Sequence, residues 1–454
     1  MALDADSFNE QAMALFRAVL DASAPKENVL CSPLGIATAL AAAEGPRPGT
    51  IKAGPRPGDL EGLAECVQSL RLCDAVRMGN LLHANTALAE DYLTVFEGSL
   101  GGKVRRTDAS SHSAAARDIS DSTNSWASEL TEGAVTSVFG TEDSRPEADT
   151  AGVPKSADQS AQRTPFEQKT RPLPQPQGSC LVNVVYLHSR WEEAFRRAGE
   201  QPFYAEPDRG LLVPMMTQTS NELPYLREPR FACVRLPYDC PASQMALFLP
   251  ALREGGLEKD VLPALARWAD VRAVLDRLAW TTDVTVTLPK VMLESPTIDV
   301  RKSLKSVNRK RPPAPNEASP GSESKPLGAN NQATNKGADK PNQTASTETR
   351  ATPSTTTVGS NDVSKAFSYA DDLWVDGLFH KATLDLTTRG GRSPPGFSTL
   401  LSLCSTIPAN EPVRFTVDRP FMFVVLKEDL LLMVGLVRNV APKAKDDDLK
   451  RYFL

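Results

Sequence analysis

The residue types that most often carry catalysis or bind metals are scattered along this 454-residue sequence. The four histidines, His83, His112, His188 and His380, lie far apart, and the seven cysteines include no CxxC pair, so the spacing predicts neither a metal site nor a redox site. No GxSxG motif marks a hydrolase nucleophile, and the glycine-rich segment 49–54 is followed by Pro55 instead of a phosphate-binding lysine. We therefore expect a binding protein, not an enzyme, with no metal ion and no cofactor.

A long turn-rich segment between two apolar segments is the feature that points most directly to function. Residues 382–386 alternate apolar with polar side chains, which predicts a strand with one buried face. Residues 421–426 form an unbroken apolar run, which predicts a strand buried on both faces. About 30 residues lie between them, and loops of that length are usually functional or disordered. The pattern predicts an exposed loop held at both ends by core strands.

Eight short motifs follow one another along the chain. They are Ser32-Pro33 with Ile36-Ala37, Asn124-Ser125-Trp126 followed by Thr131 and Gly133, Leu181-Val182-Asn183 through Trp191, Val213-Pro214-Met215-Met216, Leu288-Pro289-Lys290, His380-Lys381-Ala382, Asp418-Arg419-Pro420-Phe421, and Gly435 with Asn439 to Pro442. Each motif alone is a weak signal, but the ordered set extends over roughly four fifths of the chain. In its content and order the set resembles the serpins, the serine protease inhibitor superfamily.

The resemblance implies a mixed α/β (α+β) fold of three β-sheets surrounded by helices, with an exposed reactive-centre loop. It also implies an endopeptidase inhibitor that presents a scissile bond to a serine or cysteine protease and traps the acyl-enzyme by inserting the cut loop into its main sheet. The sequence itself predicts strands at 181–187, 231–236, 245–249, 284–288 and 431–437, and helices at 257–268 and 271–278. Few tight hairpin signals occur, which favours a large mixed sheet with helices around it.

The resemblance also assigns residues to the sheet-opening machinery. Ser32, Asn183 and His380 fall on the family's shutter beneath the main sheet, and Trp191 falls on its breach, where insertion begins. Asn183 interrupts an apolar run, so if buried it needs hydrogen-bond partners. Satisfied core polar residues with no moving part are the open alternative for Asn183 and His380. Gly35 stands where the family usually has a second shutter serine, which removes one hydrogen-bonding group.

The loop hinge corresponds to Gly390, Gly391, Arg392, Ser393, Pro394, Pro395 and Gly396. The family pattern is an acidic pair, a glycine, a small hydroxyl residue and several alanines, so the arginine and the two prolines depart from it. Each proline lacks the amide hydrogen that a central strand uses, and each unpaired carbonyl costs about 1–3 kcal/mol. The alternative function is therefore a non-inhibitory, binding or chaperone-type protein whose loop is only a substrate.

Counting from Gly390 at the family spacing places the reactive bond at Cys404-Ser405, with Leu403-Cys404 as the neighbouring choice. The leucines before this bond would suit a target protease that prefers apolar residues. Cys404 is either the primary specificity residue or an incidental thiol on an exposed loop, where it would be prone to oxidation.

Composition shifts divide the chain into one domain with insertions. A serpin-like domain is expected over 1–442, interrupted by a Pro/Gln-rich loop at 141–179 and by a low-complexity segment at 306–360, and followed by a charged tail at 443–454. The segment 306–360 has almost no large apolar residue, so we expect it to be disordered.

The formal net charge of −5 gives no general attraction to nucleic acid or to membranes, and no segment reaches the roughly 18 apolar residues of a membrane span. The N-terminal residues are acidic where a secretory signal is basic, and Ser7 and Glu10 have the spacing of a helix capping box. We therefore expect a cytoplasmic monomer whose partner is the target protease, with unconventional export as the alternative.

Overall fold

The computed structural model describes residues 4–43, 61–72, 74–84, 88, 90–107, 112–140, 179–310, 375–392 and 413–440. The chain divides into two units, one of Met1–Asn308 with Asn361–Leu454 and one of Arg309–Ser360. Every described helix and strand belongs to the first unit, except for the last two residues of one helix. The tail 443–454 and nearly all of the two predicted insertions lie outside the described residues.

The largest sheet has nine strands, in the order β1-β17-β16-β9-β8-β7-β10-β15 with β6 paired to β7. The strands are β1 (Val29–Cys31), β6 (Arg196–Glu206), β7 (Arg209–Arg227), β8 (Phe231–Pro237), β9 (Ser243–Pro250), β10 (Ala279–Pro289), β15 (Val413–Thr416), β16 (Phe421–Lys427) and β17 (Leu430–Val437). Every residue of β16 and β17 is buried, as the apolar runs predict for strands covered on both faces.

The second sheet has six strands, in the order β11-β13-β4-β2-β3 with β12 paired to β13. The strands are β2 (Val76–Ala84), β3 (Gly102–Arg106), β4 (Cys180–Leu187), β11 (Val291–Glu294), β12 (Ile298–Asp299) and β13 (Gly377–Leu386). The third sheet pairs β5 (Trp191–Glu193) with β14 (Gly390–Arg392) in parallel. This mixed architecture of three sheets with helices confirms the predicted fold class.

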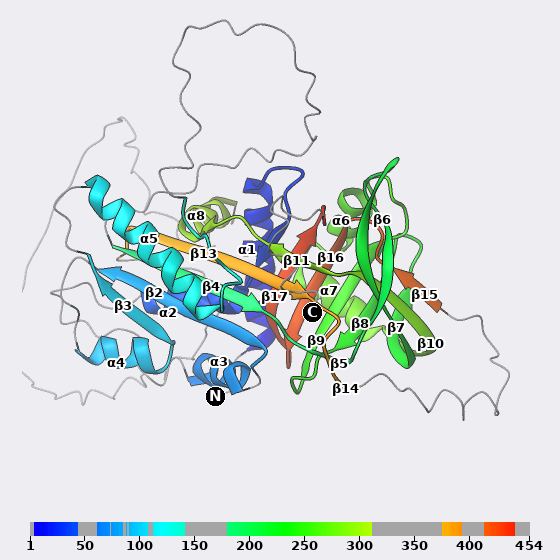
Figure 1. The fold of residues 1–454 in the computed structure, drawn as a ribbon, viewed down its shortest axis with the longest axis horizontal. Helices are drawn as coiled ribbons and strands as arrows, with labels where there is room; N and C mark the ends of the chain where they lie inside the picture. The colour runs from blue at the N-terminus through cyan, green and yellow to red at the C-terminus, as the bar shows by residue number, and fades with distance from the viewer. Residues whose placement is uncertain are drawn as a thin grey trace, which may run out of the picture. The chain divides into compact units, whose positions relative to one another are not determined.

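The helices are α1 (Ala5–Ala22), α2 (Pro33–Ala43), α3 (Glu61–Leu72), α4 (Glu90–Gly98), α5 (His112–Leu130), α6 (Leu262–Ala264), α7 (Trp268–Asp276) and α8 (Val300–Lys310), with a π-helical turn at Leu257–Val261 before α6. All eleven residues of α2 are buried, because α2 contacts β17 of the largest sheet and β4 of the six-stranded sheet. Figure 1 shows α5 crossing the other face of the six-stranded sheet in front of β2 and β4. Helices therefore cover the six-stranded sheet on both faces.

Four local expectations need correction. The strand predicted to have one buried face, now β13, is buried at all ten positions, because α2 covers one face and Phe139 packs against Phe379 on the other. The first helix is capped by Asp4, which accepts from the Ser7 amide at 3.3 Å, so it begins before the predicted capping box. The long β6–β7 hairpin was not predicted, since its turn at 207–208 is not one of the glycine-containing dipeptides that signal hairpins. Helix α8 extends to Lys310, so the first residues of the predicted low-complexity segment are helical.

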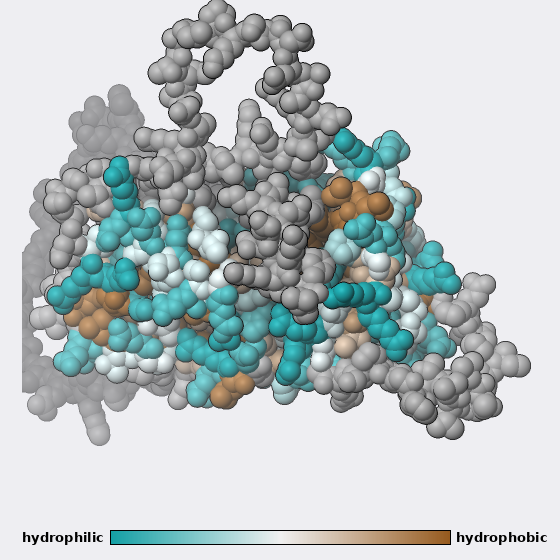
Figure 2. Space-filling model, in the orientation of Figure 1, coloured by the Kyte–Doolittle hydropathy of each residue, from teal (hydrophilic) through white to brown (hydrophobic). Residues whose placement is uncertain are grey.

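The surface carries hydrophobic residues in small areas. On the face in Figure 2, brown areas are separated by hydrophilic ones. Among the described residues, the large hydrophobic side chains that are exposed are Leu72, Leu211, Leu212, Leu252 and Trp280. Isolated exposed apolar residues of this kind are normal on a protein surface.

Candidate functional site

The parallel strands β4 and β13 are direct neighbours in the six-stranded sheet. Eight residue pairs are in register, from Gly377 opposite Cys180 to Leu384 opposite Leu187. The chain continues from β13 into the loop hinge and from β4 toward Trp191. The C-terminal ends of both strands therefore lie at the same end of the sheet, where the hinge begins.

A buried polar network joins these two strands to α2. His380 and Asn183 are register partners, and the His380 Nδ1 lies 2.8 Å from Asn183 Oδ1. The His380 Nε2 accepts from the Ser32 amide at 3.0 Å, so Nδ1 carries the proton and donates to Asn183. Burial lowers the pKa of His380 to about 3, which keeps the ring neutral. The structure thus brings together Ser32, Asn183 and His380, the three residues assigned to the shutter.

Asn80 extends this network, and sequence reasoning missed it. Asn183 Nδ2 donates to Asn80 Oδ1 at 2.8 Å and to the Gly79 carbonyl at 3.2 Å. Asn80 Nδ2 in turn donates to Thr38 Oγ1 at 3.1 Å and to the Leu100 carbonyl at 3.0 Å. Asn80 is fully buried in an apolar strand, the same signal that singled out Asn183.

Gly35 lies against this network. Asn183 occupies the space that a side chain at position 35 would need. A Cβ at Gly35 would lie 2.6 Å from Asn183 Oδ1 and 2.6 Å from Val185 Cγ2. The Gly35 amide donates to Ser32 Oγ at 3.2 Å, and that hydroxyl donates to the Leu432 carbonyl at 2.7 Å. This arrangement therefore leaves no room for a serine side chain at position 35.

The residues just before the hinge are bound to Trp191 of β5 and to Phe195, which follows β5. Trp191 donates through its indole Nε1 to the Thr387 carbonyl at 2.8 Å and through its amide to the Arg389 carbonyl at 3.0 Å. The Phe195 amide donates to the Thr388 carbonyl at 3.2 Å. The chain approaches so closely that a Cβ at Gly390 would lie 2.3 Å from the Ala194 nitrogen, so glycine is required there.

Trp191 is positioned by aromatic packing and is only 2% exposed. Its ring stacks on Tyr238 with centroids 4.6 Å apart and contacts Phe195 at 5.3 Å. This burial fixes the direction of its indole N–H toward Thr387. Trp191 therefore lies beyond the C-terminal ends of β4 and β13, and its assignment to the breach, which comes from the family resemblance, stays a prediction.

The remaining predicted site residues are only partly described. Gly390, Gly391 and Arg392 form β14, in which Gly390 pairs with Trp191 and Arg392 with Glu193. Ser393, Pro394, Pro395 and Gly396, together with the reactive-bond candidates Leu403, Cys404 and Ser405, lie outside the described residues. Their assignments stay predictions.

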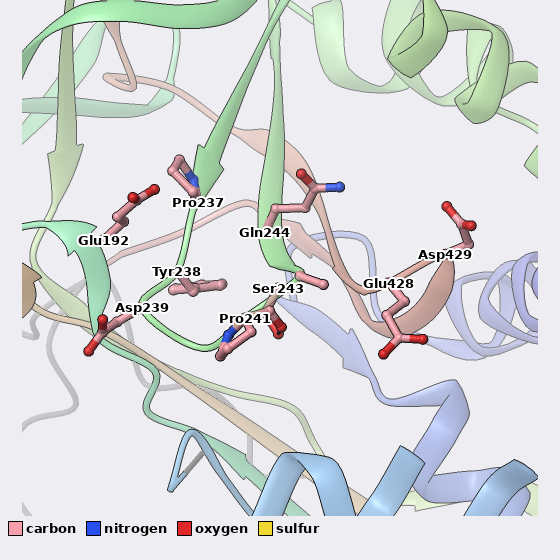
Figure 3. Close-up of a pocket in the computed structure, with 10 residues that line it drawn as sticks. Glu192, Pro237, Tyr238, Asp239, Pro241, Ser243, Gln244, Glu428 and Asp429 are labelled. Carbon is pink, nitrogen blue, oxygen red and sulfur yellow. Dashed lines mark hydrogen bonds between the residues drawn. The ribbon is translucent and has the colours of Figure 1, made fainter. Parts of the chain in front are cut away.

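A pocket of about 500 Å³ lies beside Trp191. Figure 3 shows its lining, which includes Tyr238 and the four carboxylates of Glu192, Asp239, Glu428 and Asp429. Its lining residues include no histidine or cysteine. The Tyr238 hydroxyl faces Met245 Sδ at 3.9 Å and the Ser243 hydroxyl donates to the Pro241 carbonyl, so neither is paired with a base. We assign no chemistry to this pocket.

Five of the cysteines lie in the described part of the chain, and all five are free thiols. Burial raises the pKa of Cys66 to about 11 and that of Cys180 to about 12, so both stay protonated near neutral pH. Within the same ranges, no group of three or more His, Cys, Asp or Glu side chains is arranged to hold a metal ion. None of the described helices combines the length and the apolar character needed to cross a membrane.

Comparison with known proteins supports one family. A family model described as Serpin (serine protease inhibitor) matches residues 165–313. Iris from Ixodes ricinus is 23% identical over 266 residues, which cover 57% of each chain. An uncharacterized serpin-like protein from Thermococcus kodakarensis is 23% identical over 265 residues, covering 58% of this chain and 50% of the relative. Human alpha-1-antichymotrypsin is 30% identical over 95 residues, covering 20% of this chain and 22% of the relative.

These matches agree with a fold of three sheets in which a parallel strand pair leads to a hinge. The comparisons support the serpin superfamily as the family that this chain resembles. Its alignment spans about half the length of the curated relatives that it matches.

Proposed function

We propose that the chain is a serpin-type endopeptidase inhibitor that traps a serine or cysteine protease covalently by loop insertion. The observation that carries this proposal is the direct parallel pairing of β4 with β13, the strand that leads into the loop. A segment that follows β13 through a tight turn would run antiparallel to it, and would fit between two parallel strands as a new central strand. In the proposed mechanism, the directly paired strands would be the state before insertion.

The proposed reaction begins with attack by the protease nucleophile on the carbonyl carbon of Cys404, or of Leu403 in the neighbouring choice. The peptide bond to the next residue breaks, its nitrogen takes a proton to become a free amine, and the carbonyl stays bound to the protease as an ester or thioester. Insertion of the loop from Gly390 onward then moves the acyl-enzyme away from the hinge. Trapping succeeds when insertion is faster than attack by water on the acyl bond.

Insertion has an identifiable energetic obstacle. Neighbouring strands are about 4.8 Å apart, so a new strand between β4 and β13 roughly doubles their separation. The 2.8 Å bond between His380 and Asn183 crosses this pair and must break. The shutter network therefore acts as a barrier that new backbone hydrogen bonds have to offset.

Arg392, Pro394 and Pro395 favour the second candidate function, a non-inhibitory binding protein whose cut loop stays outside. Arg392 is already paired in β14, and each proline would leave one strand carbonyl without a donor. Slow insertion turns an inhibitor into a substrate.

The test is incubation of the full chain with elastase, chymotrypsin and cathepsin-type proteases, followed by a denaturing gel. An adduct that survives detergent supports trapping, and clean cleavage near Cys404 supports the second function. The double variant Pro394→Ala, Pro395→Ala is expected to raise the adduct yield severalfold, because two missing donors cost about 1–3 kcal/mol each. An unchanged ratio of adduct to cleaved chain would show that the prolines do not limit insertion.

A further inference from the structure

A buried carboxylate lies at the base of the hinge. Asp385 is the second-to-last residue of β13 and is 8% exposed. Tyr186, on β4, donates its hydroxyl to Asp385 Oδ2 at 3.4 Å. Arg389, four residues further along, places Nη2 3.9 Å from the same oxygen. Asp385 therefore contacts both the neighbouring strand and Arg389, the residue just before the hinge.

Charged groups of both signs lie around this carboxylate, since the carboxylates of Asp74 and Glu132 and the guanidinium of Arg77 interact with the neighbouring His188. Lys290, between β10 and β11, attracts the Asp385 carboxylate electrostatically, as Arg389 does. Arg197 on β6 repels the Lys290 ammonium. His188, which follows β4, stacks on Tyr186 with ring centroids 5.0 Å apart. Burial raises the pKa of Asp385, while Arg389, Tyr186 and Lys290 oppose the shift. Proton uptake by Asp385 would remove its attraction for Arg389 and Lys290.

The direction in which the chain runs after β13 determines the hydrogen bonds that residues 387–392 make. In this structure Gly390–Arg392 runs parallel to β5, and the carbonyls of Thr387, Thr388 and Arg389 all accept hydrogen bonds from Trp191 or Phe195. A strand inserted beside β13 would have to turn round within this segment. The three hydrogen bonds and the placement of Arg389 therefore have to change before insertion.

We propose that Asp385 is a positioning residue for the hinge, holding Arg389 and with it the Thr387–Arg389 segment against β5 until the carboxylate is neutralised. The proposal rests on the proposed function for its consequence, since release of this segment would be the first step of insertion. Acid then loosens the Thr387–Arg389 segment, because a neutral Asp385 no longer attracts Arg389. Asp385 acts through Arg389 and touches no substrate.

The test is amide hydrogen exchange in residues 190–196 and 386–392 of the full chain, without any protease. Asp385→Asn keeps the size of the side chain and can still accept from Tyr186, and Arg389→Gln changes an exposed side chain, so both variants should fold. Each is expected to speed exchange of the Trp191 and Phe195 amides about fivefold at neutral pH, the effect of losing one partly exposed ion pair. Glu294→Gln is the matched control, because Glu294 pairs with Lys381 in the middle of β13 at 3.6 Å.

The pH profile separates positioning from a general structural role. After division by the intrinsic exchange rate, protection of the two segments in the wild-type chain should fall as the pH is lowered and Asp385, whose pKa is raised by burial, takes up a proton, and this fall should be absent in Asp385→Asn. A flat wild-type profile, or wild-type protection in both variants, would overturn the proposal. If the chain forms protease adducts but amide exchange is unchanged in Asp385→Asn and Arg389→Gln, only the positioning role is refuted. If exchange is faster in these variants but the chain forms no protease adduct, only trapping is refuted.

Discussion

Acidification from about pH 7.5 to about pH 5 is expected to lower the free energy of unfolding by about 4 kcal/mol, or about 2 kcal/mol for each of two buried histidines. Burial lowers the pKa of His380 from 6.5 to about 3, and burial together with Arg105 lowers that of His83 to about 4. Between these values and 6.5 the unfolded chain binds a proton on each ring and the folded chain does not. Stability is therefore complete above about pH 6.5 and is lost as the pH falls below it.

Urea unfolding at a series of pH values measures this loss. His83→Gln should remove about half of the pH dependence, because the glutamine does not titrate and can still pair with Thr123, whose Oγ1 lies 2.9 Å from His83 Nε2. The comparison uses the slope of the free energy of unfolding against pH, so a loss of stability that is equal at every pH does not affect the result. Stability that is constant, or that rises toward pH 5, would contradict the assignment of two neutral buried histidines.

Gly35→Ser is expected to destabilise the folded chain by about 3 kcal/mol, although serine is what the family usually has there. Its Cβ would lie 2.6 Å from Asn183 Oδ1 and from Val185 Cγ2. Neither group can move freely, since Asn183 is bonded to His380 and Asn80 and both side chains are fully buried. Displacing Asn183 would leave buried polar groups without partners.

Gly98→Ser is the matched control for this substitution. A Cβ at Gly98 meets nothing within 4 Å, so the same change there should have little effect. Chemical denaturation of both variants at neutral pH gives the comparison. Equal stability of Gly35→Ser and the wild-type chain would mean that the shutter network can rearrange at low cost.

Much of the fold followed from local pattern. The apolar runs that became β4, β16 and β17 are long enough and β-branched enough to be predicted without any tertiary information. The burial of the second face of β13 could not be predicted from local pattern. Thr383 and Asp385 are polar residue types that usually face solvent, and only the neighbouring elements of the fold cover them. The β6–β7 hairpin was missed because long exposed strands carry a weak periodic signal.

The site was predicted where a polar residue interrupts an apolar run. Asn183 met that criterion and was found, and Asn80 met it equally well and was overlooked. The Asp385–Arg389 pair could not be predicted, because spacing alone does not say that the strand end is buried or that Arg389 lies within reach of Asp385. Trp191 was located by family resemblance, while its bond to the Thr387 carbonyl required coordinates.

Loop insertion is tested most directly by the melting temperature of the chain before and after cleavage near Cys404. If the cut loop enters between β4 and β13, the new strand should raise the melting temperature by at least about 10 °C, since it adds a full set of central-strand hydrogen bonds. A cut chain that melts at or below the temperature of the intact chain would contradict insertion.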